Sequence, residues 1–580
     1  MKKLWIYLKD YKKETVLAPL FKLLEASFEL MIPLVVAAIV DKGIGGENLG
    51  YVYRMGGIMV LLGVVGLIAA VSAQYFAAKA AVGFATGLRS ALFKHIQSLS
   101  YTEIDTVGTS TLITRLTSDV NQVQSGVNMT LRLLLRSPFI VFGAMVMAFT
   151  VDVRSAMIFV CVIPLLSLVV FGIMYITIPM YRQVQKFLDG VLALTRENLT
   201  GIRVIRAFHK EKDEVEKFKK GNEDLTGMQL LVGKISALMN PVTYVIINLG
   251  LVVLLYTGAL KVDMGDLTQG QVIALVNYIS QILVELIKLA NLIVLLTKAL
   301  SCANRISSIF DVQSSMQEGS IDEIATLDEQ PVLEFEHVGF HYTGAAEESL
   351  TDITFTVEQG ETVGIIGGTG SGKTSLVNLI PRFYDATAGV VKYLGKPIEY
   401  YSSKRLRREI RVDPQKAVLF IGTIKSNLLW GNENATQEEM ERALEASQSM
   451  EFVQRLDGYL DAPVAQGGKN FSGGQRQRLT IARGLMGGPK ILILDDSTSA
   501  LDYATDAKLR QALRERMKET TTFIVSQRTS SIQSADKIIV LEDGHMAGIG
   551  THEELLETCS VYQEIYESQY QKPEKEENHE

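Results

Sequence analysis

Apolar runs alternate with charged segments over the first half of the chain. Four runs carry no charged side chain and two are interrupted by charge; in chain order the six lie at about 15–40, 57–78, 137–151, 155–181, 235–260 and 270–300. A bilayer-crossing helix needs about 20 mainly apolar residues, and the run at 155–181 would extend roughly 40 Å as a helix. We therefore predict six membrane-spanning helices.

Basic residues gather in alternate connections between these runs. The N-terminal segment holds five lysines, the loop at 85–136 five basic residues and the loop at 182–235 eleven, whereas the three opposite connections hold only Lys42, Arg54, Arg154 and Lys261. Cytoplasmic loops carry the excess of Lys and Arg in membrane proteins. We therefore expect a multi-pass protein of the cell membrane with the lipid bilayer around it and both termini in the cytoplasm.

The two long loops are poor in turn signals, and their apolar spacing is helical. A loop of that length without structure is uncommon in a compact protein. We expect membrane helices that continue into the cytosol and bend near Thr106–Thr111 and Thr200–Phe208, where a short helix could meet a cytoplasmic partner. The alternative is a pair of merely amphipathic cytoplasmic segments.

Charged residues inside the two interrupted runs are costly in a bilayer and usually face a bundle interior or an aqueous cavity. Each charge could line a polar translocation path or could be neutralised by a nearby opposite charge on its own helix. Lys22 and Glu25 are three residues apart, which favours an ion pair between them. For Glu29 the two interpretations are equally good. The same choice applies to the two in the last run. These residues are Lys22, Glu25, Glu29, Glu285 and Lys288.

Composition supports a membrane protein and excludes several other classes. Apolar residues make up 47% of the chain and charged residues 21%, which rules out disorder. The three cysteines, Cys161, Cys302 and Cys559, have neither metal-ligand spacing nor a disulfide framework. A net charge of -7 gives no nucleic-acid footprint, so we expect no nucleic acid among the partners.

The second half of the chain has the pattern of an α/β domain. Residues 311–331 are polar and acidic and form a linker, after which short apolar strands alternate with helices. The predicted strands are Leu333–Glu336, Val363–Ile366, Val412–Asp413, Ile491–Leu494 and Thr522–Val525. The predicted organisation is a six-helix transmembrane bundle (1–310) fused through the linker (311–331) to an α/β P-loop domain (332–570), with a disordered tail (571–580).

A phosphate-binding loop carries the first chemistry of this domain. Gly367–Thr374 reads GGTGSGKT, follows the apolar strand ETVGII and opens a helical segment. The glycines let backbone N–H groups approach phosphate oxygens. Lys373 can neutralise phosphate charge, and the Thr374 hydroxyl can hold Mg²⁺.

Two further segments complete a nucleotide site. The apolar strand Ile491–Asp495 ends in a carboxylate, which suits the second Mg²⁺-binding element of a P-loop ATPase. The segment NFSGGQRQR places Ser472 where it can cap a helix, giving a second anion-seeking helix start. A domain with two such anion-binding helix starts favours head-to-tail pairing with another domain of the same kind.

In motif content and order, nearly the whole chain resembles an ATP-binding cassette (ABC) exporter half-transporter. The resemblance implies that ATP and Mg²⁺ are bound, with the cation held by Thr374, Gln415 and Asp495. It further implies that Tyr342 stacks on adenine and that Ser499–Asp502 crosses to a partner domain. The implied nucleotide-binding residues are Tyr342, Gly367, Gly368, Thr369, Gly370, Ser371, Gly372, Lys373, Thr374, Ser375, Gln415 and Asp495, and the implied signature, which serves the partner's ATP, is Ser472, Gly473, Gly474 and Gln475.

Four positions depart from the family pattern. Asp496 stands where hydrolysing members have glutamate, and Gln527 stands at the switch histidine. The shorter carboxylate would have to shift by about one C–C bond, roughly 1.5 Å, to reach the attacking water. An amide cannot take up a proton. Phe471 replaces the usual leucine before the signature, and Gln466 replaces a frequent glutamate.

These departures predict a chain that binds ATP in a degenerate site and hydrolyses it slowly. Since the signature is complete, we expect a heterodimer in which a second half-transporter supplies the competent catalytic carboxylate. The cargo would be a hydrophobic or amphipathic small molecule, lipid or peptide. Two alternatives stay open: a regulatory or sensor subunit that does not transport, and an importer with the exporter fold.

Overall fold

The computed structural model describes residues 2–322 and 330–570, which fall into two compact units. The first unit comprises residues 1–97 and 109–312, and the second comprises residues 98–108 and 313–580. The predicted disordered tail at 571–580 and part of the predicted linker (323–329) lie outside the described residues.

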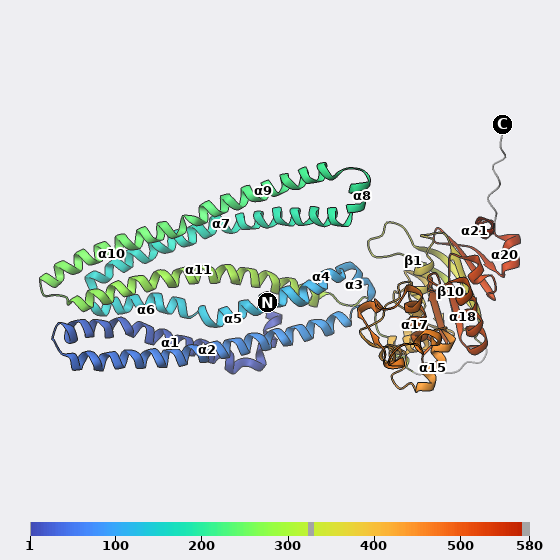
Figure 1. The fold of residues 1–580 in the computed structure, drawn as a ribbon, viewed down its shortest axis with the longest axis horizontal. Helices are drawn as coiled ribbons and strands as arrows, with labels where there is room; N and C mark the ends of the chain where they lie inside the picture. The colour runs from blue at the N-terminus through green and yellow to red at the C-terminus, as the bar shows by residue number, and fades with distance from the viewer. Residues whose placement is uncertain (1, 323–329, 571–580) are drawn as a thin grey trace. The chain divides into compact units, whose positions relative to one another are not determined.

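The first unit is built from long helices packed side by side (Figure 1). Within residues 2–322 and 330–570 the structure contains the predicted six helices long and apolar enough to cross a membrane, at Leu4–Ile44, Leu49–Gln97, Thr109–Val151, Val153–Thr200, Glu211–Asp263 and Gln269–Asp311. Their elements are η1 (Lys2–Tyr11), α1 (Lys12–Ala38), η2 (Ile39–Ile44), α2 (Leu49–Gln97), α4 (Thr109–Thr114), η3 (Arg115–Asp119), α5 (Val120–Leu133), α6 (Arg136–Val151), α7 (Val153–Thr200), α9 (Glu211–Ala237), α10 (Met239–Asp263) and α11 (Gln269–Asp311).

The long loops are helical, as the sequence predicts. Helix α7 continues without a break for 48 residues and α2 for 49. The second bend contains the short helix α8 (Ile202–Ala207), within the predicted segment. The first predicted bend, at Thr106–Thr111, contains the break at Gly108 (φ 82°) between α3 (Tyr101–Val107) and α4. The short helix α3 lies before this break and begins after Ser100, which forms a reciprocal capping box with Glu103.

Arg136 corrects the sequence interpretation, in which it counted as one basic residue of a cytoplasmic loop. It is the first residue of α6 and is only 6% exposed. Its guanidinium donates to Glu285 on α11 and to Glu29 on α1, each at 2.6 Å. A buried charge persists when it is paired and hydrogen-bonded, so Arg136 ties three helices together.

The other intramembrane charges complete this group, here called the charge cluster and defined by Lys22, Glu25, Glu29, Arg136, Glu285 and Lys288. Lys22 and Glu25 form the expected pair at 2.5 Å, and Lys288 pairs with Glu285 at 2.8 Å. Three cations thus face three carboxylates. This arrangement favours the interpretation that Lys22 and Glu25 neutralise each other. Glu29 is also paired, with Arg136, a partner that the sequence did not identify.

The second unit contains two main sheets. A six-stranded sheet has the order β12-β11-β3-β10-β9-β6, parallel except for β12, and a four-stranded antiparallel sheet has the order β2-β1-β4-β5. The predicted parallel core is therefore confirmed, whereas the antiparallel sheet was largely missed. The strands are β1 (Leu333–Phe340), β2 (Leu350–Val357), β3 (Thr362–Gly367), β4 (Ala388–Tyr393), β5 (Lys396–Pro397), β6 (Ile410–Asp413), β9 (Ile491–Asp495), β10 (Thr521–Val525), β11 (Lys537–Glu542) and β12 (His545–Gly550), with the short pair β7 (Gly422–Thr423) and β8 (Pro463–Val464) apart.

Helices surround these sheets and bury two apolar cores, one beside the parallel sheet and one between the sheets. They are α12 (Lys373–Leu379), α13 (Ser403–Glu409), α14 (Ile424–Leu428), α15 (Gln437–Ala446), α16 (Met450–Val453), α17 (Gly473–Leu485), α18 (Tyr503–Arg516), α19 (Thr529–Ile532), α20 (His552–Thr558) and α21 (Ser560–Tyr570). The described linker residues also pack here, since the N–H of Ile321 donates to the carbonyl of Tyr400 at 2.9 Å.

Helix α3 belongs to this second unit although the chain reaches it from α2. The Tyr101 ring lies 4.8 Å from the ring of Phe383, measured between centroids. The hydroxyl of Tyr384 donates to a carboxylate oxygen of Asp105 at 2.6 Å. Aromatic packing and one charge-assisted hydrogen bond therefore hold α3 on the unit.

Candidate functional site

One edge of the six-stranded sheet brings the candidate chemistry together. Strands β3, β10 and β9 are parallel neighbours, with Val525 paired to both Ile365 and Asp495. Since parallel strands end at the same edge, the phosphate loop after β3, Gln527 after β10 and Asp496 after β9 all leave the sheet there.

The phosphate loop has the backbone that only glycine accommodates at two points. Gly370 and Gly372 have φ values of 88° and 94°, in the left-handed region. A Cβ on Gly372 would also lie 2.6 Å from the carbonyl oxygen of Ser349. Gly368, Thr369 and Gly370 are exposed, so the peptide groups of the loop are open to a ligand.

Lys373 lies within this loop. Its ammonium donates to the carbonyl oxygens of Gly367 at 2.9 Å and Gly368 at 2.6 Å, and Ser371 Oγ lies 3.4 Å away. Burial lowers the pKa of Lys373, and the carboxylates of Asp495 and Asp496 oppose that shift. Placed in this way, the ammonium can neutralise phosphate charge.

The oxygen ligands expected for Mg²⁺ lie next to the loop. Thr374 Oγ1 donates to Asp495 Oδ1 at 3.3 Å. Burial is the main cause that raises the pKa of Asp495, and the Asp496 charge adds to it. Mg²⁺ is bound through one or two carboxylates, neutral oxygens and substrate phosphates, so this donor set fits the cation. When bound, Mg²⁺ would offset phosphate and carboxylate charge, with Thr374, Asp495 and Gln415 as its protein ligands.

Asp496 has an unusual backbone and one side-chain partner. Its φ is 48°, in the left-handed region, and Gln415 Nε2 donates to Asp496 Oδ2 at 3.3 Å. The peptide N–H of Asp496 donates to the carbonyl of Val525 at 3.0 Å, which fixes the residue against β10. The structure thus joins Gln415 to the carboxylate of the residue that follows β9.

Tyr342 follows β1 and lies beside the loop. Its hydroxyl is 3.1 Å from Ser375 Oγ, and its ring meets Tyr384 edge-on at 5.4 Å between centroids. A cavity of about 340 Å³ adjoins this ring and is walled partly by Asp105 and Thr106 of α3. The structure therefore brings the expected base platform close to α3, which the sequence did not predict.

The signature segment forms a capped helix start. Ser472 Oγ accepts from the N–H of Gln475 at 3.3 Å, while Gln475 Oε1 accepts from the N–H of Ser472 at 2.9 Å. A Cβ on Gly473 would meet nothing within 4 Å, and Gly474 lies close to the carbonyl of Ala500. The predicted cap at Ser472 is thus present, and the backbone at this helix start is open.

Phe471, which departs from the family pattern, has a structural explanation. The side chain is buried and its ring meets that of Phe452 at 6.3 Å and 60°. The guanidinium of Arg478 covers the other ring, 5.0 Å from the Phe452 centroid. The buried ring of Phe471 therefore packs against Phe452 directly before the signature. Gln466 lies exposed in the short turn η6 (Gln466–Gly468).

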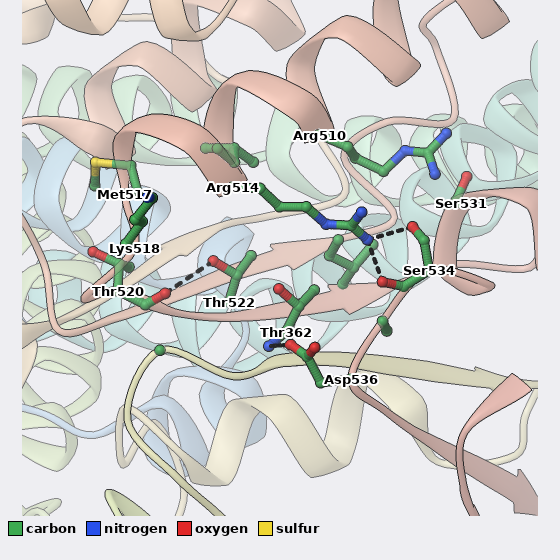
Figure 2. Close-up of a pocket in the computed structure, with 14 residues that line it drawn as sticks. Thr362, Arg510, Arg514, Met517, Lys518, Thr520, Thr522, Ser531, Ser534 and Asp536 are labelled. Carbon is green, nitrogen blue, oxygen red and sulfur yellow. Dashed lines mark hydrogen bonds between the residues drawn. The ribbon is translucent and has the colours of Figure 1, made fainter.

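A separate cavity of about 300 Å³ lies between α18 and the ends of β3 and β10 (Figure 2). Two of its three lining cations have partners within the unit: Arg514 donates to Ser534, and Arg510 pairs with Asp506 at 3.2 Å; the third is Lys518. Asp536 accepts from the N–H of Thr362 at 2.8 Å. None of the candidate nucleotide residues lines this cavity, so its polar groups serve the packing of α18 against the sheet.

Two families match the chain. Residues 15–286 match the ABC transporter transmembrane region, and residues 350–499 match the ABC transporter domain. The first match covers most of the helical unit and the second contains the phosphate loop, the signature and Asp496.

Full-length relatives share this arrangement. The chain is 36% identical over 571 residues to the uncharacterized ABC transporter ATP-binding protein YfiB of Bacillus subtilis (strain 168), covering 98% of this chain and 99% of that one. It is 30% identical over 517 residues, 88% of each chain, to the ATP-dependent lipid A-core flippase of Hahella chejuensis. Its fold matches the structure of a bacterial Atm1-family ABC exporter with ATP bound, with a TM-score of 0.78 at 22% identity over 97% and 99% of the two chains.

Proposed function

Because the chain belongs to the ABC transporter family, we propose that it is one subunit of a heterodimeric exporter that moves hydrophobic or amphipathic compounds out of the cytoplasm. In this proposal the chain binds Mg²⁺-ATP through the phosphate loop, Tyr342, Gln415 and Asp495 but hydrolyses it slowly. Its signature, Ser472–Gln475, acts on the ATP of the partner subunit.

One observation supports the proposal: the phosphate loop and the residues expected to hold Mg²⁺ lie at one sheet edge, and both altered residues follow β10 and β9, the next two strands after β3 along that edge. The altered residues are Asp496, which lies after β9, and Gln527, which lies after β10. The Asp496 carboxylate is one methylene short and is engaged by Gln415 at 3.3 Å. A general base must come within hydrogen-bond reach of the proton that it removes, so this position is poorly suited to activate water.

Gln527 weakens the same step in a different way. Its amide can donate a hydrogen bond to a γ-phosphate but cannot change its protonation or carry charge. We therefore expect this site to bind ATP but to hydrolyse it slowly. Asp496 and Gln527 would both act on the γ-phosphate of the same ATP. Two changes in one reaction favour a changed role of this site over random sequence drift.

The complete signature favours a heterodimer. The capped start of α17 keeps its backbone open at Gly473, as expected for a surface that receives the partner's nucleotide. In a homodimer both sites would carry Asp496 and Gln527, whereas a partner with glutamate and histidine at these positions would provide one competent site.

Charge and apolar surface support the orientation and cargo class that we propose. Lys261, one of four basic residues assigned to the non-cytoplasmic side, is neutralised by Asp152 at 2.5 Å. A cavity of about 630 Å³ between α1 and α6 is lined almost entirely by apolar side chains, among them Met31, Phe139 and Phe142. Both termini would be cytoplasmic, and α3 and α8 would carry nucleotide-driven movement to the membrane helices.

A gain-of-function experiment tests the degenerate site. The purified chain alone should hydrolyse Mg²⁺-ATP slowly, and the double variant Asp496→Glu with Gln527→His should raise the rate by about 100-fold or more, the typical contribution of a positioned base. Lys373→Ala is the matched variant that should abolish nucleotide binding in either background. The degenerate-site proposal is wrong if the unmodified chain alone hydrolyses ATP rapidly, at a rate that the double variant does not exceed.

The heterodimer is tested by isolating the tagged chain from its native membranes. We expect a second half-transporter to copurify in equal amount. In that pair Asp496→Asn should leave most of the ATPase rate, whereas the corresponding change in the partner should abolish it. Equal losses from the two changes, or recovery of this chain only with itself, would contradict the asymmetric assignment.

A second candidate function is a regulatory or sensor subunit that binds ATP without transport. Asp496 and Gln527 favour it, because a slowly hydrolysing site can act as a clamp. Reconstituted vesicles discriminate between the two functions. A transporter stops moving every tested lipid, drug or peptide when this chain is cross-linked in one conformation, whereas a regulator tolerates the cross-link. Uptake in place of export in the same vesicles would identify the importer alternative.

A further inference from the structure

The C-terminal helix α21 reaches the loop that carries Gln527. At its last turn, the side-chain amide of Gln569 makes three hydrogen bonds to the segment between β10 and α19. Nε2 donates to the carbonyl oxygen of Gln527 at 2.8 Å, and Oε1 accepts from the N–H and the hydroxyl of Thr529 at 2.9 and 3.0 Å. One side chain thus binds both sides of Arg528.

These bonds require a donor and an acceptor side by side, which a side-chain amide provides and other side chains of similar size do not. The NH₂ group faces a carbonyl that can only accept, and the amide oxygen faces two donors. Thr529 is fully buried and is the first residue of α19, whose N-cap residue Arg528 makes no side-chain capping bond. The oxygen of Gln569 therefore satisfies a buried N–H that would otherwise cost free energy.

Helix α21 holds Gln569 in place because its other end is anchored. Tyr562 is fully buried in the apolar core beside the sheet, and its hydroxyl lies 2.7 Å from His552 Nδ1. Gln563 ties the same helix to α20, since its Nε2 donates to the carbonyl of Leu556. The amide of Gln569 is thus presented by a fixed element.

Other contacts hold the loop on either side of the Gln527 carbonyl. After it, the Arg528 guanidinium donates to the carbonyl of Ser499 at 3.3 Å and lies over the Tyr503 ring. Ser526 is fixed by its N–H, which donates to the carbonyl of Ile365 at 3.1 Å, and by its hydroxyl, which accepts from the N–H of Arg528 at 3.0 Å. Gln527 lies between these contacts with an exposed side chain. The bond from Gln569 to the Gln527 carbonyl therefore sets the direction in which the Gln527 peptide leaves the sheet.

We propose that Gln569 is a positioning residue that fixes Gln527 for contact with the γ-phosphate, so that α21 sets how strongly this chain prefers ATP over ADP. The inference rests on the proposed role of Gln527 at the γ-phosphate. Gln569 acts on the loop backbone and does not touch the nucleotide. Loss of its amide lets the switch loop move and weakens one of the contacts to the γ-phosphate, the group that ADP lacks.

Equilibrium binding of Mg²⁺-ATP and Mg²⁺-ADP to the full-length chain tests this. The readout is the ratio of the ADP Kd to the ATP Kd. Both constants can be measured at equilibrium because we expect this chain to hydrolyse ATP slowly. We expect Gln527→Ala to lower the ratio about tenfold, the value of one hydrogen bond to a charged group. Gln569→Ala should lower it about three- to tenfold, with the ADP Kd unchanged within about twofold.

Two further variants separate positioning from stability. Gln569→Glu keeps the size and the acceptor oxygens but places a carboxylate against the Gln527 carbonyl, so the ratio should fall as far as in Gln569→Ala. Gln563→Ala removes a glutamine bond from the same helix without touching the switch loop, and the ratio should stay at the wild-type value. The double variant Gln527→Ala with Gln569→Ala should match Gln527→Ala alone, since both act through one contact.

The outcomes distinguish the inference from its premise. A normal ratio in both Gln569 variants, with a lowered ratio in Gln527→Ala, overturns the inference and leaves the role of Gln527 intact. A normal ratio in Gln527→Ala itself overturns both. An equal fall in Gln563→Ala shows that α21 acts only through its stability, which also overturns the positioning role.

Discussion

Replacing Arg136 by leucine should destabilise the membrane unit far more than replacing Lys288 by methionine. Both cations donate to the same oxygen, Glu285 Oε1, Arg136 at 2.6 Å and Lys288 at 2.8 Å. They differ in burial, since the side chain of Arg136 is 7% exposed and that of Lys288 is 43% exposed. The two cations also differ in their number of partners, since Arg136 binds Glu29 as well; the comparison therefore tests a buried, shared cation against a half-exposed one at the same acceptor.

The expected magnitudes follow from the charges left behind. Without Arg136, Glu285 keeps Lys288 and the hydroxyl of Ser137 at 2.8 Å, and Glu25 keeps Lys22, but Glu29 loses the only cation that contacts it among the described residues. Removing one partner of a buried pair costs about 3–5 kcal/mol. That figure applies to the pair of Arg136 with Glu285, whose side chains are 7% and 3% exposed; Glu29 is 37% exposed and adds little. Loss of the half-exposed Lys288 should cost at most about 1 kcal/mol.

Tryptophan fluorescence during heating provides the assay. The chain has two tryptophans, of which Trp5 lies in the membrane unit and Trp430 in the other. In a Trp430→Phe background Trp5 reports the membrane unit alone. At roughly 2 °C per kcal/mol for a unit of this size, Arg136→Leu should lower the transition midpoint by about 6–10 °C and Lys288→Met by about 2 °C or less.

Arg136→Lys provides an intermediate test, because an ammonium keeps the charge but cannot bind two carboxylates with the fork of a guanidinium. Its midpoint should lie between those of the wild type and Arg136→Leu. Equal shifts for Arg136→Leu and Lys288→Met, or no shift for Arg136→Leu, would refute the argument that the charge cluster depends on its buried arginine.

Three smaller changes give further tests. Tyr384→Phe removes the hydrogen bond to Asp105 at 2.6 Å, so amide hydrogen exchange in α3 should rise about tenfold, given about 1.4 kcal/mol for the bond. Gly372→Ala, with φ at 94°, should weaken ATP binding at least about tenfold, whereas Gly473→Ala should leave this chain's own ATP binding unchanged. Phe471→Leu should lower the melting temperature by the equivalent of about 1 kcal/mol and leave the ATPase rate of the pair within about twofold.

The features predictable from the sequence are those encoded in short windows. The apolar runs are recognisable as membrane helices from their own residues. The phosphate-loop motif Gly367–Thr374 is recognisable because a strand precedes it and a helix follows it. Ser472 is a helix cap because the third residue after it, Gln475, can complete the capping box. Local patterns of this kind do not require knowledge of which segments meet in space.

The features that the sequence did not reveal depend on distant partners. Arg136 resembles any loop arginine until Glu285, 149 positions away, is placed beside it. Gln569 is one more polar residue of an amphipathic helix until α21 reaches the loop after β10. β2 is the exception, because its alternating pattern in Leu350–Val357 was visible in the sequence and was overlooked.

The assignment of α3 to the second unit has a practical consequence for dissecting this protein. The polypeptide passes between the two units three times, after Gln97, after Gly108 and after Val312. A fragment that starts at Gln313 would keep every nucleotide-binding motif and yet lose a helix that covers Phe383 and Tyr384. Such a fragment would present bare aromatic rings to solvent, and its tendency to aggregate would reflect the missing segment and not a fault of the ATPase core.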